Sequence, residues 1–169
     1  MGEAFVQGLY HEALSTLQFP ERPAMSTVKD CLSQKPQRVI SVSSHDSVQT
    51  TLELMKTHRV RAVLVIDNDV LTGIVSQGDC AIRAFLPGRD ARSTPVSEIM
   101  TPNPQTVKLG DPMDMCMGMM AARGYRHLPV LANDRVIGVV SIGDVVKKMM
   151  GDLGEHVSFL ETYIKGHSA

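Results

Sequence analysis

The chain has 169 residues with 17 basic and 18 acidic side chains, so its formal net charge is −1. Because it has few aromatic residues and no basic block, the composition argues against a protein that tracks a phosphate backbone or stacks on nucleic-acid bases. The longest apolar run, residues 62–66, is too short to cross a bilayer, so we expect a cytoplasmic protein with no membrane or nucleic-acid partner.

Residues 1–24 are expected to form a helical extension outside the rest of the fold. Phe5, Leu9 and Ala13 recur at helical spacing, and Pro20 and Pro23 then end the pattern. A packing extension is the simplest role for such a segment.

Most of the remaining chain contains one unit twice. Residues 42–83 and 107–148 align without a gap at a constant offset of 65 residues. Matched identities of several chemical types are Val42/Val107, Asp46/Asp111, Met55/Met120, Arg61/Arg126 and Asn68/Asn133. Such variety indicates an internal duplication. Because a unit of about 60 residues is marginal alone, the two copies are expected to pack together as one module.

Each unit is expected to contain a short lead-in, an extended segment, a helix, a β-hairpin and a second helix. The first helix opens at Asp46-Ser47 or Asp111-Pro112, which are favourable N-terminal signals. The hairpins turn at Asn68-Asp69 and Asn133-Asp134. Strand 62–66 is apolar on both faces, so helices should cover the sheet in an α/β fold.

The sequence units are bounded as follows. The first unit spans residues 25–86, a linker 87–95, the second unit 96–150 and a separate C-terminal helix 151–169. The lead-ins are residues 28–32 and 96–100. The separate last helix is predicted from apolar residues at helical spacing after Gly151 and Gly154.

No metal site or disulfide is expected. The three cysteines are widely spaced and form no C-x-x-C motif. The methionines of residues 113–120 fall on two faces of a helix, so one site cannot collect their sulfurs. Met113, Met117 and Met120 should fill the core, which leaves Met115 and Met119 to form part of a homodimer interface.

The most informative motif is G-x-x-S-x-G-D, at residues 73–79 and 138–144. The serine is placed to cap a helix whose N-terminal amides attract a phosphate. The aspartate can accept both hydroxyls of a ribose diol, so the pair predicts a nucleotide site. For one copy seen alone, a capping box with no ligand is the better explanation. The motif occurs twice, each time with the same upstream glycine and hairpin, and this recurrence favours the ligand-binding interpretation.

In these residues the chain resembles a tandem pair of CBS domains, a regulatory module also called a Bateman module. The most specific strings are Tyr-Arg-His-Leu-Pro-Val at 125–130 and the motif at 138–144, and the resemblance covers about residues 28–150. It implies two β-α-β-β-α units packed through their sheets about a pseudo-twofold axis. It also implies no catalysis, and two clefts for adenosine-containing ligands such as AMP, ADP, ATP, NAD or S-adenosylmethionine.

The resemblance also implies which residues contact the ligand. One cleft is expected to use Asp144, Ser141, Ile40, Val60, Arg61, Ala62 and His127. The other is expected to use Asp79, Ser76, Thr101, Asn103, Gln105, Tyr125 and Arg126. His127 falls where the family places a basic contact to a phosphate.

The leading hypothesis is a non-catalytic adenosine-nucleotide sensor that signals as a homodimer to a protein target that the sequence does not identify. One alternative is a ligand-independent interaction protein that keeps the fold. A second is a redox regulator acting through Cys80, which lies in the first turn of a predicted helix.

Overall fold

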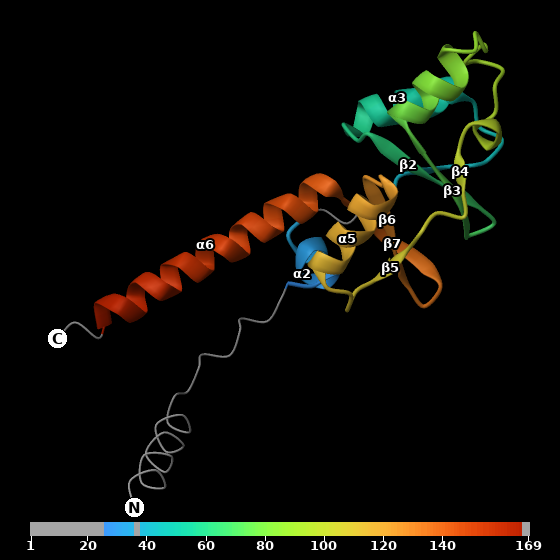
Figure 1. The fold of residues 1–169 in the computed structure, drawn as a ribbon. Helices are drawn as coiled ribbons and strands as arrows, with labels where there is room; N and C mark the ends of the chain where they lie inside the picture. Colours follow the sequence, from blue (N-terminus) through green and yellow to red (C-terminus); the bar gives the residue numbers. More distant parts are fainter. Residues whose placement is uncertain (1–25, 36–37, 167–169) are drawn as a thin grey trace, which may run out of the picture.

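The computed structural model describes residues 26–35 and 38–166, with side chains described as far as Gly154. The helix expected in residues 1–24 lies outside these residues. Within them, two sheets are each covered by helices (Figure 1).

Both repeats have the predicted β-α-β-β-α order. The first contains β1 (Ser41–Val42), α3 (Val48–His58), β2 (Ala62–Asp67), β3 (Val70–Ser76), α4 (Gln77–Asp79) and the π-helix η1 (Cys80–Phe85). The second contains β5 (Val107–Lys108), α5 (Met113–Arg123), β6 (His127–Ala132), β7 (Arg135–Ser141) and α6 (Ile142–Gly166). Among the described residues, the sheet orders are β1-β2-β3-β4 and β5-β6-β7, and β3 and β7 contact each other between the sheets.

Local sequence explains the hairpins. Asn68 and Asp69 have φ of 50° and 65°, and Asn133 and Asp134 have φ of 49° and 60°. Positive φ at both central residues is typical of a type I′ turn, whose twist matches that of the paired strands. Asn and Asp tolerate this region better than most residues, which confirms both predicted turns.

The lead-in segments are exchanged between the repeats. Helix α2 (Val28–Ser33) precedes the first repeat but packs in the core of the second, with Val107, Leu128 and Val140. The 3-10 helix η2 (Val96–Glu98) precedes the second repeat but packs in the core of the first. In Figure 1 the blue α2 lies beside α5 of the second repeat. Each packed unit therefore consists of one repeat and the lead-in of the other.

Matching backbone hydrogen bonds hold the exchanged segments. The amide of Val28 donates to the Asp111 carbonyl over 2.9 Å, and that of Val96 donates to the Asp46 carbonyl over 2.8 Å. Two further bonds are equally matched: Met113 N–H to Ser26 O (2.9 Å) and Val48 N–H to Thr94 O (3.0 Å). The exchange is thus a property of the repeated unit. It also supplies partners for amides at the start of α5 and α3.

Gly73 and Gly138 make room for these exchanged segments. A Cβ at Gly73 would lie 2.4 Å from the sulfur of Met100, and one at Gly138 would lie 3.1 Å from Cδ2 of Leu32. Gly73 is also paired with Pro102 of β4 (Thr101–Pro102), which adds the residues just after the second lead-in to the first sheet. The motif glycine therefore serves close packing of chain segments.

The C-terminal helix differs from the prediction. Instead of a separate helix after residue 150, α6 runs without interruption from Ile142 to Gly166 and projects away from the two sheets (Figure 1). Gly151 and Gly154 each weaken a helix by only about 1 kcal/mol relative to alanine, and the segment has no proline, so the helix continues. In the described part of the chain, no helix is both long and apolar enough to traverse a membrane.

The faces of α5 largely follow the prediction. Met113, Cys116 and Met120 are buried, whereas Met115 is 41% exposed. Met119 is only partly buried and packs against the core together with Met117. Met115 is therefore the clearer surface residue of the pair predicted for an interface.

Candidate functional site

Two cavities lie where the repeats meet. The first cavity has a volume of about 910 Å³ and the second about 540 Å³. Both fall in the range of roughly 300 to 1,000 Å³ that is usual for small-molecule sites. Arg61, Ala62, Arg126 and His127 line both, so the two cavities share a wall.

The structure brings together nearly all the predicted site residues. All seven predicted for the first cleft line the first cavity: Asp144, Ser141, Ile40, Val60, Arg61, Ala62 and His127. Six of the seven predicted for the other cleft line the second cavity: Asp79, Ser76, Thr101, Gln105, Tyr125 and Arg126. Asn103 is not among its lining residues, because the backbone there follows the sheet edge and the Asn103 amide donates to the Thr72 carbonyl over 3.0 Å.

At the first cavity, Ser141 and Asp144 form the predicted capping box. The backbone amide and hydroxyl of Ser141 both donate to Asp144 Oδ2 over 2.8 Å, and the Asp144 amide donates back to the Ser141 hydroxyl over 3.2 Å. The other carboxylate oxygen, Oδ1, has no hydrogen-bond partner among the described residues. Capping and ligand binding are therefore compatible, since capping uses one oxygen.

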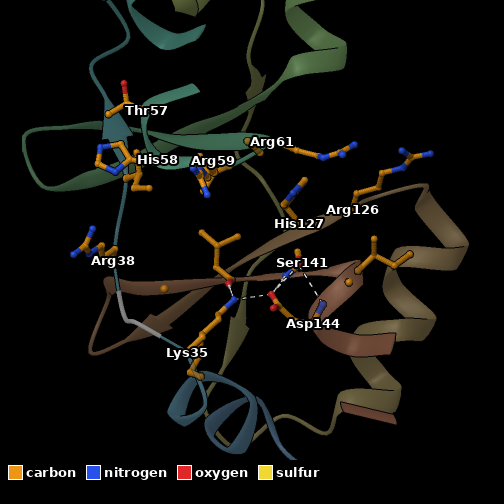
Figure 2. Close-up of a pocket in the computed structure, with 18 residues that line it drawn as sticks. Lys35, Arg38, Thr57, His58, Arg59, Arg61, Arg126, His127, Ser141 and Asp144 are labelled. Carbon is orange, nitrogen blue, oxygen red and sulfur yellow. Dashed lines mark hydrogen bonds and ion pairs between the residues drawn. The ribbon is translucent and has the colours of Figure 1, made fainter. Parts of the chain in front are cut away.

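Lys35 also contacts this carboxylate. Its ammonium lies 2.6 Å from Asp144 Oδ2 and 2.6 Å from the Val139 carbonyl (Figure 2). Burial by itself would raise the pKa of Asp144, but the hydrogen bonds from Lys35 and Ser141 outweigh it and hold the pKa below its ordinary value. Asp144 is thus an ionised acceptor at neutral pH.

His127 faces the same carboxylate from the start of β6. Burial disfavours its charged form and lowers its pKa from the ordinary value of 6.5, although the charge of Asp144 partly opposes this. At neutral pH the imidazole is therefore uncharged. The positive potential of the cavity comes from lysine and arginine.

The lowered pKa of His127 predicts a pH-dependent stability. Well above pH 6.5 this histidine is uncharged in both the folded and the unfolded state, and its contribution to folding is complete. As pH falls below 6.5, the unfolded chain takes up a proton that the folded protein resists, so stability declines. The urea concentration at the midpoint of unfolding should be measured at one pH above 6.5 and at one below it. The decrease between the two should be larger in the native protein than in His127→Gln. Equal falls in the two proteins would contradict the assignment.

At the second cavity the equivalent carboxylate has a different partner. Ser76 donates its amide and hydroxyl to Asp79 Oδ2 over 2.9 and 2.6 Å. Asp79 Oδ1 lies 3.5 Å from Nε of Arg83, one turn further along the chain. Arg83 is itself held by hydrogen bonds to the carbonyls of Ile99 and Met100. Asp79 and Asp144 therefore form the same capping box, but Asp79 is paired with Arg83 and Asp144 with Lys35.

Cys80 does not have the properties of a reactive thiol. It is 1% exposed, and burial, with the neighbouring charge of Asp79, raises its pKa to about 11. Because the thiolate is the reactive form, the redox alternative loses its physical basis.

Sequence reasoning missed three cations of the first cavity: Lys35, Arg38 and Arg59. They lie outside the repeated motif, and Lys35 follows directly after α2, the segment that packs against the other repeat. A signal was present in the comparison of the copies, because glycine stands at 124 where the first copy has Arg59.

Comparison with known proteins agrees with this geometry. The family model described as CBS domain matches twice, at residues 28–83 and 96–151. The chain is 32% identical over 128 residues to the CBS domain-containing protein YhcV of Bacillus subtilis, covering 76% of this chain and 89% of that protein. It is 28% identical over 150 residues to the mitochondrial CBS domain-containing protein CBSX3 of Arabidopsis thaliana, covering 83% and 73%.

Solved structures give the same result. A CBS-domain containing protein from Agrobacterium tumefaciens superposes with a TM-score of 0.70 at 33% identity, covering 75% of this chain and 96% of that one. The CBS domain pair of protein MJ0100, solved with 5-methylthioadenosine and S-adenosyl-L-methionine, superposes with a TM-score of 0.65 at 27% identity, covering 75% and 98%.

Proposed function

Since the chain belongs to the CBS-domain family, as a tandem pair, we propose that it is a regulatory module binding adenosine-containing ligands in the cavities between its repeats. One observation carries the proposal. Each cavity joins the Ser-Asp helix start of one repeat to the hairpin start of the other, as Asp144 and Arg61 do in the first cavity. A ligand bound there contacts both repeats.

The chemistry of each cavity suits a nucleotide. Oδ1 of Asp144, which has no partner within the described part of the chain, is an acceptor for a ribose hydroxyl, and the shared arginines suit a phosphate. AMP, ADP, ATP, NAD and S-adenosylmethionine are the candidate ligands, and the complex of MJ0100 with S-adenosyl-L-methionine supports this class. We propose no catalytic role for these residues.

Regulation follows from the position of the cavities. A ligand that contacts both repeats makes different contacts when their relative angle changes, and such a difference is what a ligand-driven switch requires. We propose that this change is passed to a separate protein target.

We further propose that the module is a homodimer. On α6, residues 142–154 expose Ile142, Val146, Met149, Met150 and Leu153, the last two by 69% and 65%. On η1 and at the residue that follows it, Ile82, Phe85 and Leu86 are 65%, 55% and 80% exposed. Exposed apolar groups of this size usually mark an interface, and Met115 of α5 adds to them.

Native mass spectrometry tests ligand binding and assembly together. We expect a dimer that takes up AMP, ATP, NAD or S-adenosylmethionine at a defined number of sites per chain. A stable monomer would contradict the proposed dimer. A protein that binds none of these ligands would instead favour the ligand-independent interaction protein.

A further inference from the structure

The two cavities differ strongly in charge. Among the described residues that line the first cavity there are five cations, Lys35, Arg38, Arg59, Arg61 and Arg126, and one carboxylate, Asp144, a net formal charge of +4. The second cavity has Arg61 and Arg126 against Asp79, a net formal charge of +1. The whole chain carries −1, so this concentration is local.

Three cations account for the difference, and they have no charged equivalents in the second cavity. Lys35 is the third residue after Leu32, and the third residue after the matching Met100 is Asn103. The position of Arg59 in the second copy is Gly124. Lys35 and Arg59 point toward the space between the repeats, whereas the Arg38 side chain, at the edge of the cavity, points away from Asp144 (Figure 2).

Arg59 is present at some cost to the local backbone. It ends α3 with φ of 54°, whereas Gly124 ends α5 with φ of 70°. Glycine adopts this left-handed conformation readily, and arginine does so unfavourably. A residue held in an unfavourable conformation at the wall of a cavity suggests a functional reason for its presence.

Lys35 solves an electrostatic difficulty of the first cavity. A carboxylate that holds the ribose diol would repel the phosphates attached to the same ribose. The Lys35 ammonium neutralises Asp144 by direct contact at 2.6 Å. An ammonium has three donors, and the contacts of Lys35 with Asp144 and Val139 use two. One N–H, unpaired among the described residues, is left for a phosphate oxygen.

We propose that the first cavity is selective for a nucleoside di- or triphosphate, and that Lys35 and Arg59 determine this selectivity. The inference rests on the proposed function and narrows it for one cavity. The net charge of +4 favours a chain of phosphates over the single phosphate of AMP. It disfavours S-adenosylmethionine, which carries a net positive charge.

Calorimetric titration of the full chain with ATP, AMP, adenosine and S-adenosylmethionine tests the inference. We expect ATP to bind more tightly than AMP by roughly tenfold or more, and S-adenosylmethionine to bind the first cavity weakly. Lys35→Met should weaken ATP by roughly ten- to hundredfold without weakening adenosine. Lys29→Met is the matched control, because Lys29 is an exposed lysine on α2, the helix just before Lys35, and lines neither cavity.

A second variant, Arg59→Gly, tests whether weaker ATP binding could come from destabilised folding. It should weaken ATP as Lys35→Met does while the melting temperature stays the same or rises, because glycine relieves the left-handed backbone. Equal affinities for ATP, AMP and S-adenosylmethionine, or an unchanged preference in both variants, would overturn the inference and leave the proposed function intact. Failure of the native protein to bind any of these ligands would overturn both.

Discussion

Leu32→Ala is expected to destabilise the second repeat by about 2 to 5 kcal/mol, although Leu32 precedes the first repeat in the chain. Leu32 is 1% exposed and packs in the core with Val107, Leu128 and Val140. Truncation leaves a cavity beside Gly138, whose missing side chain offers nothing to fill it. The effect comes from lost burial and lost contacts.

Hydrogen exchange resolved by segment locates this effect. Leu32→Ala should accelerate exchange in residues 107–145, whereas Ile99→Ala, from the other lead-in, should accelerate it in residues 42–84. Ser33→Ala, at an exposed position of the same helix, is the control and should change little. If Leu32→Ala loosened residues 42–84 instead, the exchange of lead-ins would be refuted.

Asp144→Asn is expected to weaken an adenosine ligand in the first cavity by roughly ten- to hundredfold. The amide keeps one oxygen, which can still accept from Ser141 and cap α6, but its NH2 group cannot accept a ribose hydroxyl. Alanine would be a poorer choice, because it also removes the oxygen that accepts from the Ser141 amide and hydroxyl, which is half of the capping box.

Asp79→Asn is the matched variant for the second cavity. It has the same capping box and the same chemical change, but it faces the smaller cavity. Calorimetric titration should show that each variant weakens binding at a different one of the two cavities. The melting temperatures of both variants should stay close to that of the native protein. Unchanged ligand affinity in Asp144→Asn, with binding intact in the native protein, would remove Asp144 from the site.

The sequence by itself predicted the features that depend on neighbouring residues. The duplication at an offset of 65 residues gave the repeated unit, and the family match confirms it. The Asn-Asp turns and the Ser-Asp caps formed as expected, because their geometry is set by residues no more than a few positions apart. The pairing of these motifs with the opposite hairpin came from the family resemblance.

The tertiary structure alone decided which repeat each lead-in joins. Two similar repeats offer similar apolar sites, so the amphipathic pattern of α2 fits either one. Bonds between distant residues, such as Val28 to Asp111, settle the choice. The continuity of α6 through Gly151 was likewise missed, because glycine weakens a helix without preventing it.

The charge of the first cavity was also decided by tertiary structure. The three cations Lys35, Arg38 and Arg59 come from the residues just after α2, the following extended segment and the end of α3, and none belongs to the repeated motif. The exchange carries Lys35 to Asp144, 109 positions further along the chain. The sequence thus determined the repeated parts of the site. Only long-range packing decided how the two cavities differ, because side chains from separate segments converge on each.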